Sequence, residues 1–498
     1  MHIIENVRHV AGKAGEKISG IFEKTGLANL ARKTGFIQRS TSKIQGEDFV
    51  RLMTTEILGD ETVTTEGLCD ILRQINPEAD ITPQAMSERL NNKESAEYLK
   101  EVFESALREN LEPLRSDVSH TLLSGFDRVF LEDSTQIALH EKLADKFRGS
   151  GGKASISAIK IDLTYEVRQD ILCKILISEG NIPDQSRAEE ILGEIGENDL
   201  ILGDMGYFTL NSLSRIGEKN AFFLSRLPKS VGVYLSADDD AASVNLPKYL
   251  DKKFSSLTVT DTDVWLGEKK VPCRLVAYRL PDEVVGERRE KARRNARKKG
   301  RQPTQEHLDW LGYGFFITNV PQEIWEPEVT GTAYRLRWQI ELTFRHWKSL
   351  MKINIVKGSH PERVECFLCG RLTAVLIAEM FCGYASWYAY KYLKKEAGFY
   401  KLISWLKRKD RLAKAADTGS LTELFDEMRE IMSKSLCKQK RKRKTTHQLL
   451  DEGIPYMDSF LPEESENGDN SLIPFKKAAQ CSLKNKITFL RACYCSKS

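Results

Sequence analysis

Hydrophobic and charged positions recur with a helical period in the stretch from Tyr334 to Lys348. At about 100° per residue of α-helix, one arc of about 80° collects the apolar side chains Leu336, Ile340, Phe344 and Trp347. A neighbouring arc of about 60° collects Tyr334, Arg337, Glu341 and Lys348. The pattern predicts one α-helix that packs its apolar stripe into a core and places one acid among a phenol and two cations.

The region from Phe49 to about Leu114 has apolar residues at three-and-four spacing, which predicts three or four short helices. The pattern breaks at Asn76-Pro77 and again near Asn91-Asn92. A tight turn precedes ITPQAMSERL, in which Thr82 would cap a helix that has Pro83 at its first position. This arrangement resembles a DNA-reading helix-turn-helix, and a small helical bundle without DNA contacts is the alternative.

Strand-like patterns begin near Gly125. FDRVFLEDST predicts a strand that ends at Asp133, and QIALHEKLADKFRG predicts a helix after it. SISAIKIDLTYEV and DILCKILISEG alternate like two antiparallel strands. The apolar run Leu200 to Leu202 predicts a buried strand, with Asp204 just past its end. In an α/β sheet, positions that follow the strands in this way face the crevice in which ligands bind.

The chain between Asp204 and Glu341 is much longer than one helical crossover requires. Its strand-like runs SVGVYLS, SSLTVTDTDVWL, CRLVAYRL and GFFITNV predict a β-rich insertion over residues 227–321. Residues 390–436 have a mixed helical pattern. The basic run KQKRKRK (438–444) and the acidic stretch after it predict a mobile linker with a secondary patch for DNA or a partner.

With 498 residues, the chain has room for about three domains. Its net charge is only +4, so binding to nucleic acid has to be argued from clusters of cations. One cluster contains a single acid, Glu290, among nine cations: Arg288, Arg289, Lys291, Arg293, Arg294, Arg297, Lys298, Lys299 and Arg301. We expect this cluster to contact the DNA backbone, and an exposed, self-repelling helix is the alternative. Residues 1 to about 45 are also basic and are typical of a solvated arm.

The ten cysteines show no disulfide framework, which favours reduced thiols in the cytoplasm. The most apolar stretch, Leu372 to Tyr390, is interrupted by Glu379 and predicts a buried helix, not a membrane span. We therefore expect a cytoplasmic protein that has no membrane partner.

The spacing Y-x2-R-x3-E-x6-K of Tyr334, Arg337, Glu341 and Lys348 resembles the signature of bacterial cut-and-paste insertion-sequence transposases. The resemblance implies an RNase H-like core with an Asp-Asp-Glu triad, so two aspartates should lie upstream of Glu341. Asp133 in EDST and Asp204 in GDMGY both follow apolar runs, and their contexts resemble the family's first and second catalytic motifs. For an isolated aspartate after a strand, a helix cap or a turn is the alternative.

Three carboxylates without a zinc-type histidine spacing predict a hard divalent cation, Mg²⁺, or Mn²⁺ as a substitute. The expected ligands and catalytic residues are Asp133, Asp204 and Glu341. Arg337 and Lys348 would bind phosphates, and Tyr334 would donate to the DNA backbone. By resemblance, Trp310 is a candidate for stacking on a flipped base, with Trp265 or Trp325 as substitutes and core packing as the alternative for each.

The sequence thus predicts an α/β fold: an RNase H-like mixed-sheet core interrupted by a β-rich insertion, with helical N- and C-terminal regions. The expected parts are a DNA-binding region (1–120), the core in two pieces (121–226 and 322–390), the insertion (227–321) and a helical, linker-like C-terminal region (391–498). The resemblance implies a dimer that binds double-stranded DNA, both terminal inverted repeats and target, in the bacterial nucleoid. An RNase H-like nuclease that never joins DNA, and a domesticated non-catalytic DNA-binding protein, are the alternatives.

Overall fold

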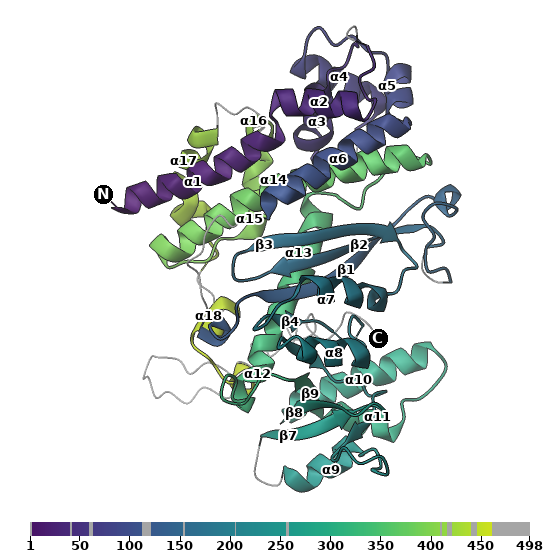
Figure 1. Ribbon diagram of the computed structural model, residues 1–498, viewed down its shortest axis with the longest axis vertical. Coiled ribbons are helices and arrows are strands. Elements are labelled where there is room, and N and C mark those ends of the chain that lie inside the picture. The colour runs from purple at the N-terminus through teal and green to yellow at the C-terminus, as the bar shows by residue number, and fades with distance from the viewer. Residues whose placement is uncertain are drawn as a thin grey trace, which may run out of the picture. The chain divides into compact units, whose positions relative to one another are not determined.

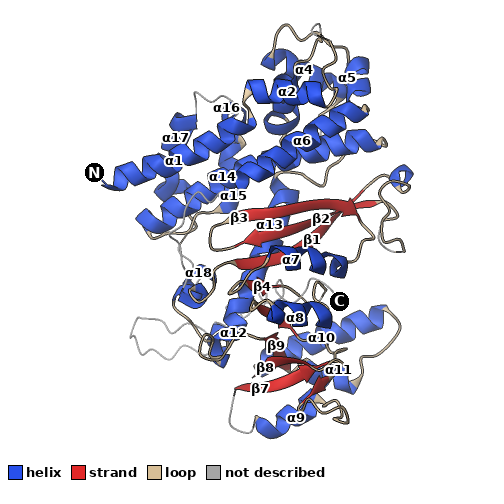
Figure 2. Ribbon diagram, viewed as in Figure 1, coloured by secondary structure: helices blue, strands red, loops and turns tan. Residues whose placement is uncertain are grey.

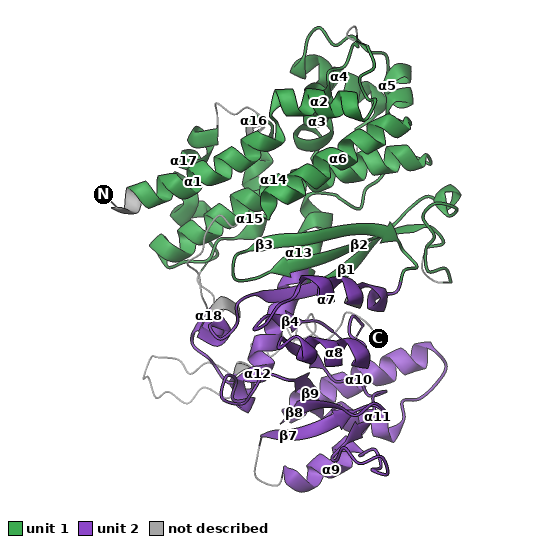
Figure 3. Cartoon of the chain, in the orientation of Figure 1, with its two compact units in different colours: residues 1–118, 133–182, 341–440 green, residues 119–132, 183–340, 441–498 purple. Residues whose placement is uncertain are grey.

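The structure is a computed structural model that describes residues 2–39, 42–58, 63–111, 121–152, 155–204, 206–254, 258–408, 411–415, 421–439 and 446–460. The chain forms two compact units (Figure 3). The first unit consists of residues 1–118, 133–182 and 341–440, and the second of residues 119–132, 183–340 and 441–498. The chain passes from one unit to the other within strand β1 (Val129–Ala138) and again within helix α13 (Arg337–Leu350).

Helices dominate the first unit (Figure 1). They are α1 (His2–Ile21), α2 (Lys24–Lys33), α3 (Gly46–Arg51), α4 (Thr65–Ile75), α5 (Pro83–Leu90), α6 (Lys93–Asn110), α14 (Pro361–Leu393), α15 (Phe399–Leu406), α16 (Arg411–Ala415) and α17 (Leu421–Ile431). Helices α1, α6 and α15 pack against α14. Within the described residues, α14 alone is long and apolar enough to cross a membrane, but 89% of its most apolar window is buried inside the protein. It is therefore a core helix, as the sequence predicts.

Close backbone contact secures α14 in this core. A Cβ atom on Gly370 would lie 2.2 Å from the carbonyl oxygen of Met53, in the π-helical turn Leu52–Glu56, so only glycine fits at this crossing. The predicted start of α5 is confirmed, because the Ala85 N–H donates to Thr82 Oγ1 at 3.2 Å and Pro83 occupies the first turn.

The strands form a mixed sheet, and Figure 2 shows them in red. They are β1, β2 (Ala158–Glu166), β3 (Ile171–Glu179), β4 (Leu200–Leu202), β5 (Phe222–Arg226), β6 (Val233–Tyr234), β7 (Val259–Leu266), β8 (Val271–Arg279) and β9 (Tyr313–Thr318). Their hydrogen-bonded order is β3-β2-β1-β4-β5-β9-β8-β7-β6. Strands β1, β4 and β5 are parallel, whereas β2 and β3 form an antiparallel hairpin. The order β3-β2-β1-β4-β5 confirms the predicted RNase H-like core.

Strands β6 to β9 come from the predicted insertion and follow β5 in this order. Strand β9 pairs with β5, from Leu224 with Thr318 to Arg226 with Phe316. Helices α9 (Leu246–Lys253), α10 (Asp282–Lys298) and α11 (Gln305–Trp310) accompany these strands, and α7 (Ala188–Glu194), α8 (Leu210–Glu218) and α12 (Pro327–Ala333) complete the second unit's longer helices. All four strand-like runs of the insertion thus contain a strand.

Two local predictions around Asp133 are wrong. Strand β1 does not end at Asp133 but continues to Ala138, because the alternation of exposed Gln136 and buried Ile137 extends the strand pattern. The predicted helix after it is absent from the described residues, where only the short 3-10 turn Glu141–Leu143 forms. The buried positions Leu143 and Phe147 resemble a helical spacing but belong to turns.

The signature helix begins later than the sequence predicts. Tyr334–Leu336 forms a 3-10 turn that continues from α12, and the α-helix starts at Arg337. Residues 446–460 also differ from the prediction. Helix α18 (Thr446–Asp451) and the turn Met457–Phe460 belong to the second unit, and Leu450 on α18 and Tyr456 just before the turn are buried. The predicted mobile linker is therefore wrong for 446–460, whereas the basic residues 440–444 and the acidic stretch after residue 460 lie outside the described residues.

Candidate active site and nucleic-acid surfaces

Asp133 and Asp204 lie at matching distances from one residue pair of the strands β1 and β4, Asp133 within β1 and Asp204 beyond the end of β4. The parallel register of β1 and β4 ends with Leu131 opposite Leu202, so each aspartate lies two residues beyond the same pair. Both side chains are half-buried. Paired strands of a sheet lie about 4.8 Å apart.

The turn after β4 fixes the Asp204 side chain. The Gly206 N–H donates to Asp204 Oδ1, and the Tyr207 N–H donates to the Asp204 carbonyl at 3.0 Å. Asp204 is thus also a turn former, which was the alternative interpretation, but a carboxylate in such a turn keeps capacity for further partners. A Cβ on Gly206 would lie 2.8 Å from Asp204 Oδ1 and 3.6 Å from Asp184 Oδ2. Asp184 is a neighbouring carboxylate that sequence reasoning missed, since it follows Pro183 in an ordinary turn sequence.

In the first unit, a hydrogen bond joins the signature helix to the strand of Asp133. Lys348 Nζ on α13 donates to the carbonyl oxygen of Gln136 on β1 at 2.8 Å. Burial lowers the pKa of Lys348, and the ammonium group still has further donors for a phosphate. Glu341 is half-buried two turns before Lys348 on the same helix face.

The predicted apolar stripe of this helix is confirmed. Leu336, Ile340, Phe344 and Trp347 are all buried. Trp347 Nε1 donates to Glu379 Oε1 on α14 at 2.8 Å. Burial raises the pKa of Glu379 to about 8, and the nearby Asp170 carboxylate adds to the effect, whereas the Trp347 bond opposes it. The core contact of α13 therefore includes one polar anchor.

Tyr334 and Arg337 lie in the second unit. The Tyr334 side chain is only 6% exposed, with its ring 5.3 Å from that of Phe316 and the Arg226 guanidinium 5.2 Å from its centroid. Arg337 is buried at the first position of α13. Because Tyr334 belongs to the 3-10 turn, it does not share the helical arc that the sequence predicts for all four signature residues.

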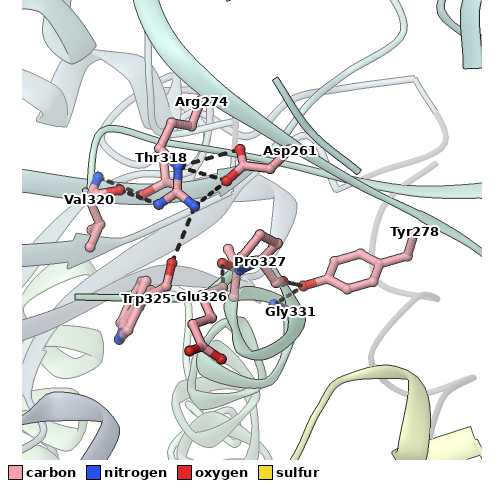
Figure 4. A network of polar contacts seen from close by, with 10 residues as sticks. Asp261, Arg274, Tyr278, Thr318, Val320, Trp325, Glu326, Pro327 and Gly331 are labelled. Atoms are coloured by element: carbon pink, nitrogen blue, oxygen red, sulfur yellow. Dashed lines mark hydrogen bonds and ion pairs between the residues drawn. The ribbon is translucent and has the colours of Figure 1, made fainter. Parts of the chain in front are cut away.

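A buried polar network holds the segment that leads to Tyr334 (Figure 4). Arg274 on β8 forms an ion pair with Asp261 on β7, and its guanidinium also donates to the carbonyls of Val320 and Trp325, the latter at 3.2 Å. Both side chains of the ion pair are largely buried. The network fixes the backbone between β9 and α12, which directly precedes the signature.

The predicted basic cluster lies on helix α10 and in the turn after it, and two groups of its cations differ in their surroundings. Arg288 donates to the carbonyl of Tyr313 at 3.0 Å and Arg289 to that of Leu308 at 2.9 Å, so these two half-buried side chains hold α10 against its neighbours. The other group is exposed and comprises Arg293, Arg294, Arg297, Lys298 and Lys299. Its side chains suit a phosphate backbone.

The three candidate tryptophans differ in their surroundings. Trp310, at the end of α11, is half-buried with its ring 4.3 Å from that of Phe315. Trp265 on β7 is also half-buried. Trp325 is fully buried, and its Nε1 donates to the Leu122 carbonyl at 2.8 Å, so its ring has no face for a base.

In the N-terminal region, α2 and the loop after it expose a group of cations, whereas the exposed cation of the predicted helix-turn-helix pair, Arg73 on α4, forms an ion pair with Asp70. Arg89, the only cation of α5, donates to the Phe36 carbonyl and lies 4.6 Å from the centroid of the Phe36 ring. By contrast, α2 and the loop after it contain no acid and expose Lys24, Arg32, Lys33, Arg39 and Lys43. We call these five residues the α2 cation group.

Among the residues that the structure describes, no three His, Cys, Asp or Glu side chains form a group that could hold a metal ion. Cys366 and Cys369 of the CxxC sequence are buried in α14, and burial raises the pKa of both thiols. The half-buried carboxylates of Asp133, Asp204 and Glu341 are oxygen donors of the type that Mg²⁺ and Mn²⁺ prefer. Their donor chemistry therefore fits such an ion.

The chain is similar in sequence to known proteins. Residues 124–377 match the family described as "Transposase DDE domain". The chain is 30% identical over 383 residues to the transposase for insertion sequence element IS1151 of Clostridium perfringens, covering 73% of this chain and 79% of that protein. It is 27% identical over 454 residues to the transposase for IS231B of Bacillus thuringiensis subsp. berliner, covering 86% and 92%.

The chain belongs to the family of insertion-sequence DDE transposases. The resemblance inferred from the sequence is thereby confirmed at the level of the family. The matched range of the transposase starts before β1 and ends within α14, so it contains the two aspartates and the signature helix. The family match does not assign roles to individual side chains, so the roles of Asp133, Asp204 and Glu341 stay predictions.

Proposed function

We propose that this transposase cuts DNA at the ends of its insertion sequence and joins the 3′ ends to target DNA, in a cut-and-paste reaction. One observation in a DDE transposase chain carries the proposal. Asp133 and Asp204 each lie two residues beyond the paired Leu131 and Leu202, and both precede the helix of Glu341 in the sequence. A protein that only bound DNA would have no need of three carboxylates at these positions.

Asp133, Asp204 and Glu341 would hold Mg²⁺, or Mn²⁺ in its place. When bound, such ions activate a water or a DNA 3′-hydroxyl and stabilise the leaving oxygen. Lys348, which contacts the Gln136 carbonyl, would bind a phosphate with its remaining donors. Arg337 would bind a second phosphate, and Tyr334 would contact the DNA backbone.

The test uses DNA duplexes that carry the ends of the element and are already cut, so that only joining is measured. In Mg²⁺, the full-length protein should transfer the 3′-hydroxyl ends into a target plasmid. An RNase H-like nuclease would cut uncut ends without giving this product, and a domesticated DNA-binding protein would do neither. Either result would overturn the proposal.

Two surfaces would bind double-stranded DNA along its backbone: the exposed end of α10 and the α2 cation group. The α4–α5 pair is a poor candidate, because its exposed side chains include Glu66, Asp70 and Glu88. Trp310 would stack on a flipped base near an end, since its ring is only partly covered. A homodimer that brings two ends together in the bacterial cytoplasm, on the nucleoid, completes the proposal.

Neutralising the exposed end of α10 should weaken DNA binding in a salt-dependent way. With Arg293, Arg294, Arg297 and Lys298 all changed to Gln, we expect the slope of log Kd against log salt to fall by about 0.9 for each DNA phosphate that these side chains neutralise in the wild-type complex. Binding titrations at several salt concentrations measure the slope. The charge-matched control changes four exposed lysines of the same unit to Gln: Lys248, Lys252, Lys253 and Lys269. Equal slopes for both variants would show that α10 contributes only net charge.

Changing the anchoring residues Arg288 and Arg289 should instead lower the melting temperature, because their hydrogen bonds to the carbonyls of Tyr313 and Leu308 would be lost.

A further inference from the structure

The C-terminal segment 446–456 packs against the helix that precedes the signature. In this segment Leu449 and Leu450 are buried, and Tyr456 is only 3% exposed. The Tyr456 N–H donates to the carbonyl of Glu328 at 2.7 Å, and Thr332 Oγ1 donates to the carbonyl of Ile454 at 2.8 Å. The segment is therefore bonded to both ends of α12.

The Tyr456 ring rests directly on the backbone of α12. A Cβ atom on Gly331 would lie 2.5 Å from Tyr456 Cγ, so any larger residue at position 331 would displace the ring. The Gly331 N–H donates to the Tyr278 hydroxyl at 3.0 Å, and this hydroxyl donates in turn to the Pro327 carbonyl (Figure 4). Tyr278 thus holds α12 from β8, while Tyr456 holds it from the C-terminal segment.

Aromatic contacts extend from Tyr456 to the signature. The ring of Tyr456 lies 4.7 Å from that of Tyr278 and 5.5 Å from that of Phe316. Phe316 in turn contacts Tyr334, and the Arg335 guanidinium lies 5.3 Å from the Tyr456 centroid. Two residues of the turn Tyr334–Leu336 therefore contact this aromatic group. Tyr334 contacts Phe316, and Arg335 lies against the ring of Tyr456 itself.

From this geometry we infer that Tyr456 is a positioning residue for DNA cleavage and joining. Together with Thr332 and Gly331, it sets the place of the turn Tyr334–Leu336 and so the first residue of α13, Arg337. The inference rests on the proposed function, because it assigns the C-terminal segment to the placement of the predicted phosphate-binding residues. Small displacements of such residues cost large factors in rate.

The test compares Tyr456→Ala, Tyr456→Phe and Gly331→Ala in the full-length protein. Single-turnover cleavage of DNA that carries the element's ends gives the rate constant, and titration gives Kd. We expect Tyr456→Ala and Gly331→Ala to slow cleavage by about tenfold to a hundredfold with little change in Kd. Tyr456→Phe keeps the ring and should restore most of the rate.

Leu250→Ala is the control for reduced stability alone, since Leu250 is a buried core residue of α9 in the same unit. It should lower the melting temperature but leave the cleavage rate unchanged well below that temperature. The inference is overturned if Tyr456→Ala cleaves at the normal rate, or if its decrease in rate equals that of Leu250→Ala at matched stability. A wild-type protein that neither cuts nor joins would overturn the proposed function instead.

Discussion

Changing Asp133 to Asn, Asp204 to Asn or Glu341 to Gln should each lower DNA cleavage on the order of a thousandfold or more. Each change would remove one of the charged oxygen ligands that we propose for a divalent ion, and such an ion contributes several kcal/mol to the transition state. Binding to the element's ends should persist, because the exposed cations of α10 and α2 are untouched. Gel-based cleavage in Mg²⁺ and a parallel binding titration measure the two effects.

Asp184→Asn is the matched control, because the Asp184 carboxylate lies beside the same turn as Asp204. If charge near the turn were all that mattered, Asp184→Asn would be as damaging as Asp204→Asn. We expect a much smaller decrease than for Asp204→Asn, because Asp184 is outside the proposed ligand set. If one of the three triad variants still cuts DNA in Mg²⁺, the residue changed in that variant is not a metal ligand.

Periodicity predicts the parts of this fold in which burial decides the structure. The apolar stripe of α13 and the short strand β4 are recognisable because every side chain that they bury is apolar. The position of Asp204 follows from the end of β4. The matched register of Asp133 with it could not be predicted, because register depends on pairing between distant segments and β1 gives no local stop signal.

The surroundings of the individual cations of α10 could not be predicted from the sequence either. Arg288 and Arg293 look alike in the sequence, yet one donates to a backbone carbonyl and the other is exposed. Their difference depends on which face of α10 meets α11 and β9, and the sequence of α10 alone is too uniformly basic to reveal that face.

The C-terminal segment differs from its predicted linker for a related reason. The stretch from Thr446 to Tyr456 reads THQLLDEGIPY and contains few apolar residues, which is typical of a linker. Tyr456 is buried because Gly331 leaves room for its ring, and the two positions are far apart in the sequence. A fit between two residues that are so far apart in the sequence leaves no local sequence pattern from which it could be predicted.

Among the single variants of the second unit, Arg274→Met should cause the largest loss of stability. Asp261 would keep a largely buried negative charge, and the carbonyls of Val320 and Trp325 would be left without this donor. Breaking a buried pair from one side costs about 3–5 kcal/mol. For a unit of this size we expect the melting temperature to fall by roughly 10 °C.

The exposed ion pair of Lys229 with Glu306 provides the control, since Lys229→Met breaks a pair that is 30% and 60% exposed. Its effect should stay below about 1 kcal/mol. The double variant Arg274→Met with Asp261→Asn should regain part of the stability, because the unpaired charge is gone. Thermal unfolding of the wild type and the three variants measures these differences. If Arg274→Met melts like Lys229→Met, the buried network does not stabilise the segment before α12, and the placement of Tyr334 must depend on the aromatic contacts of Phe316 and Tyr456 alone.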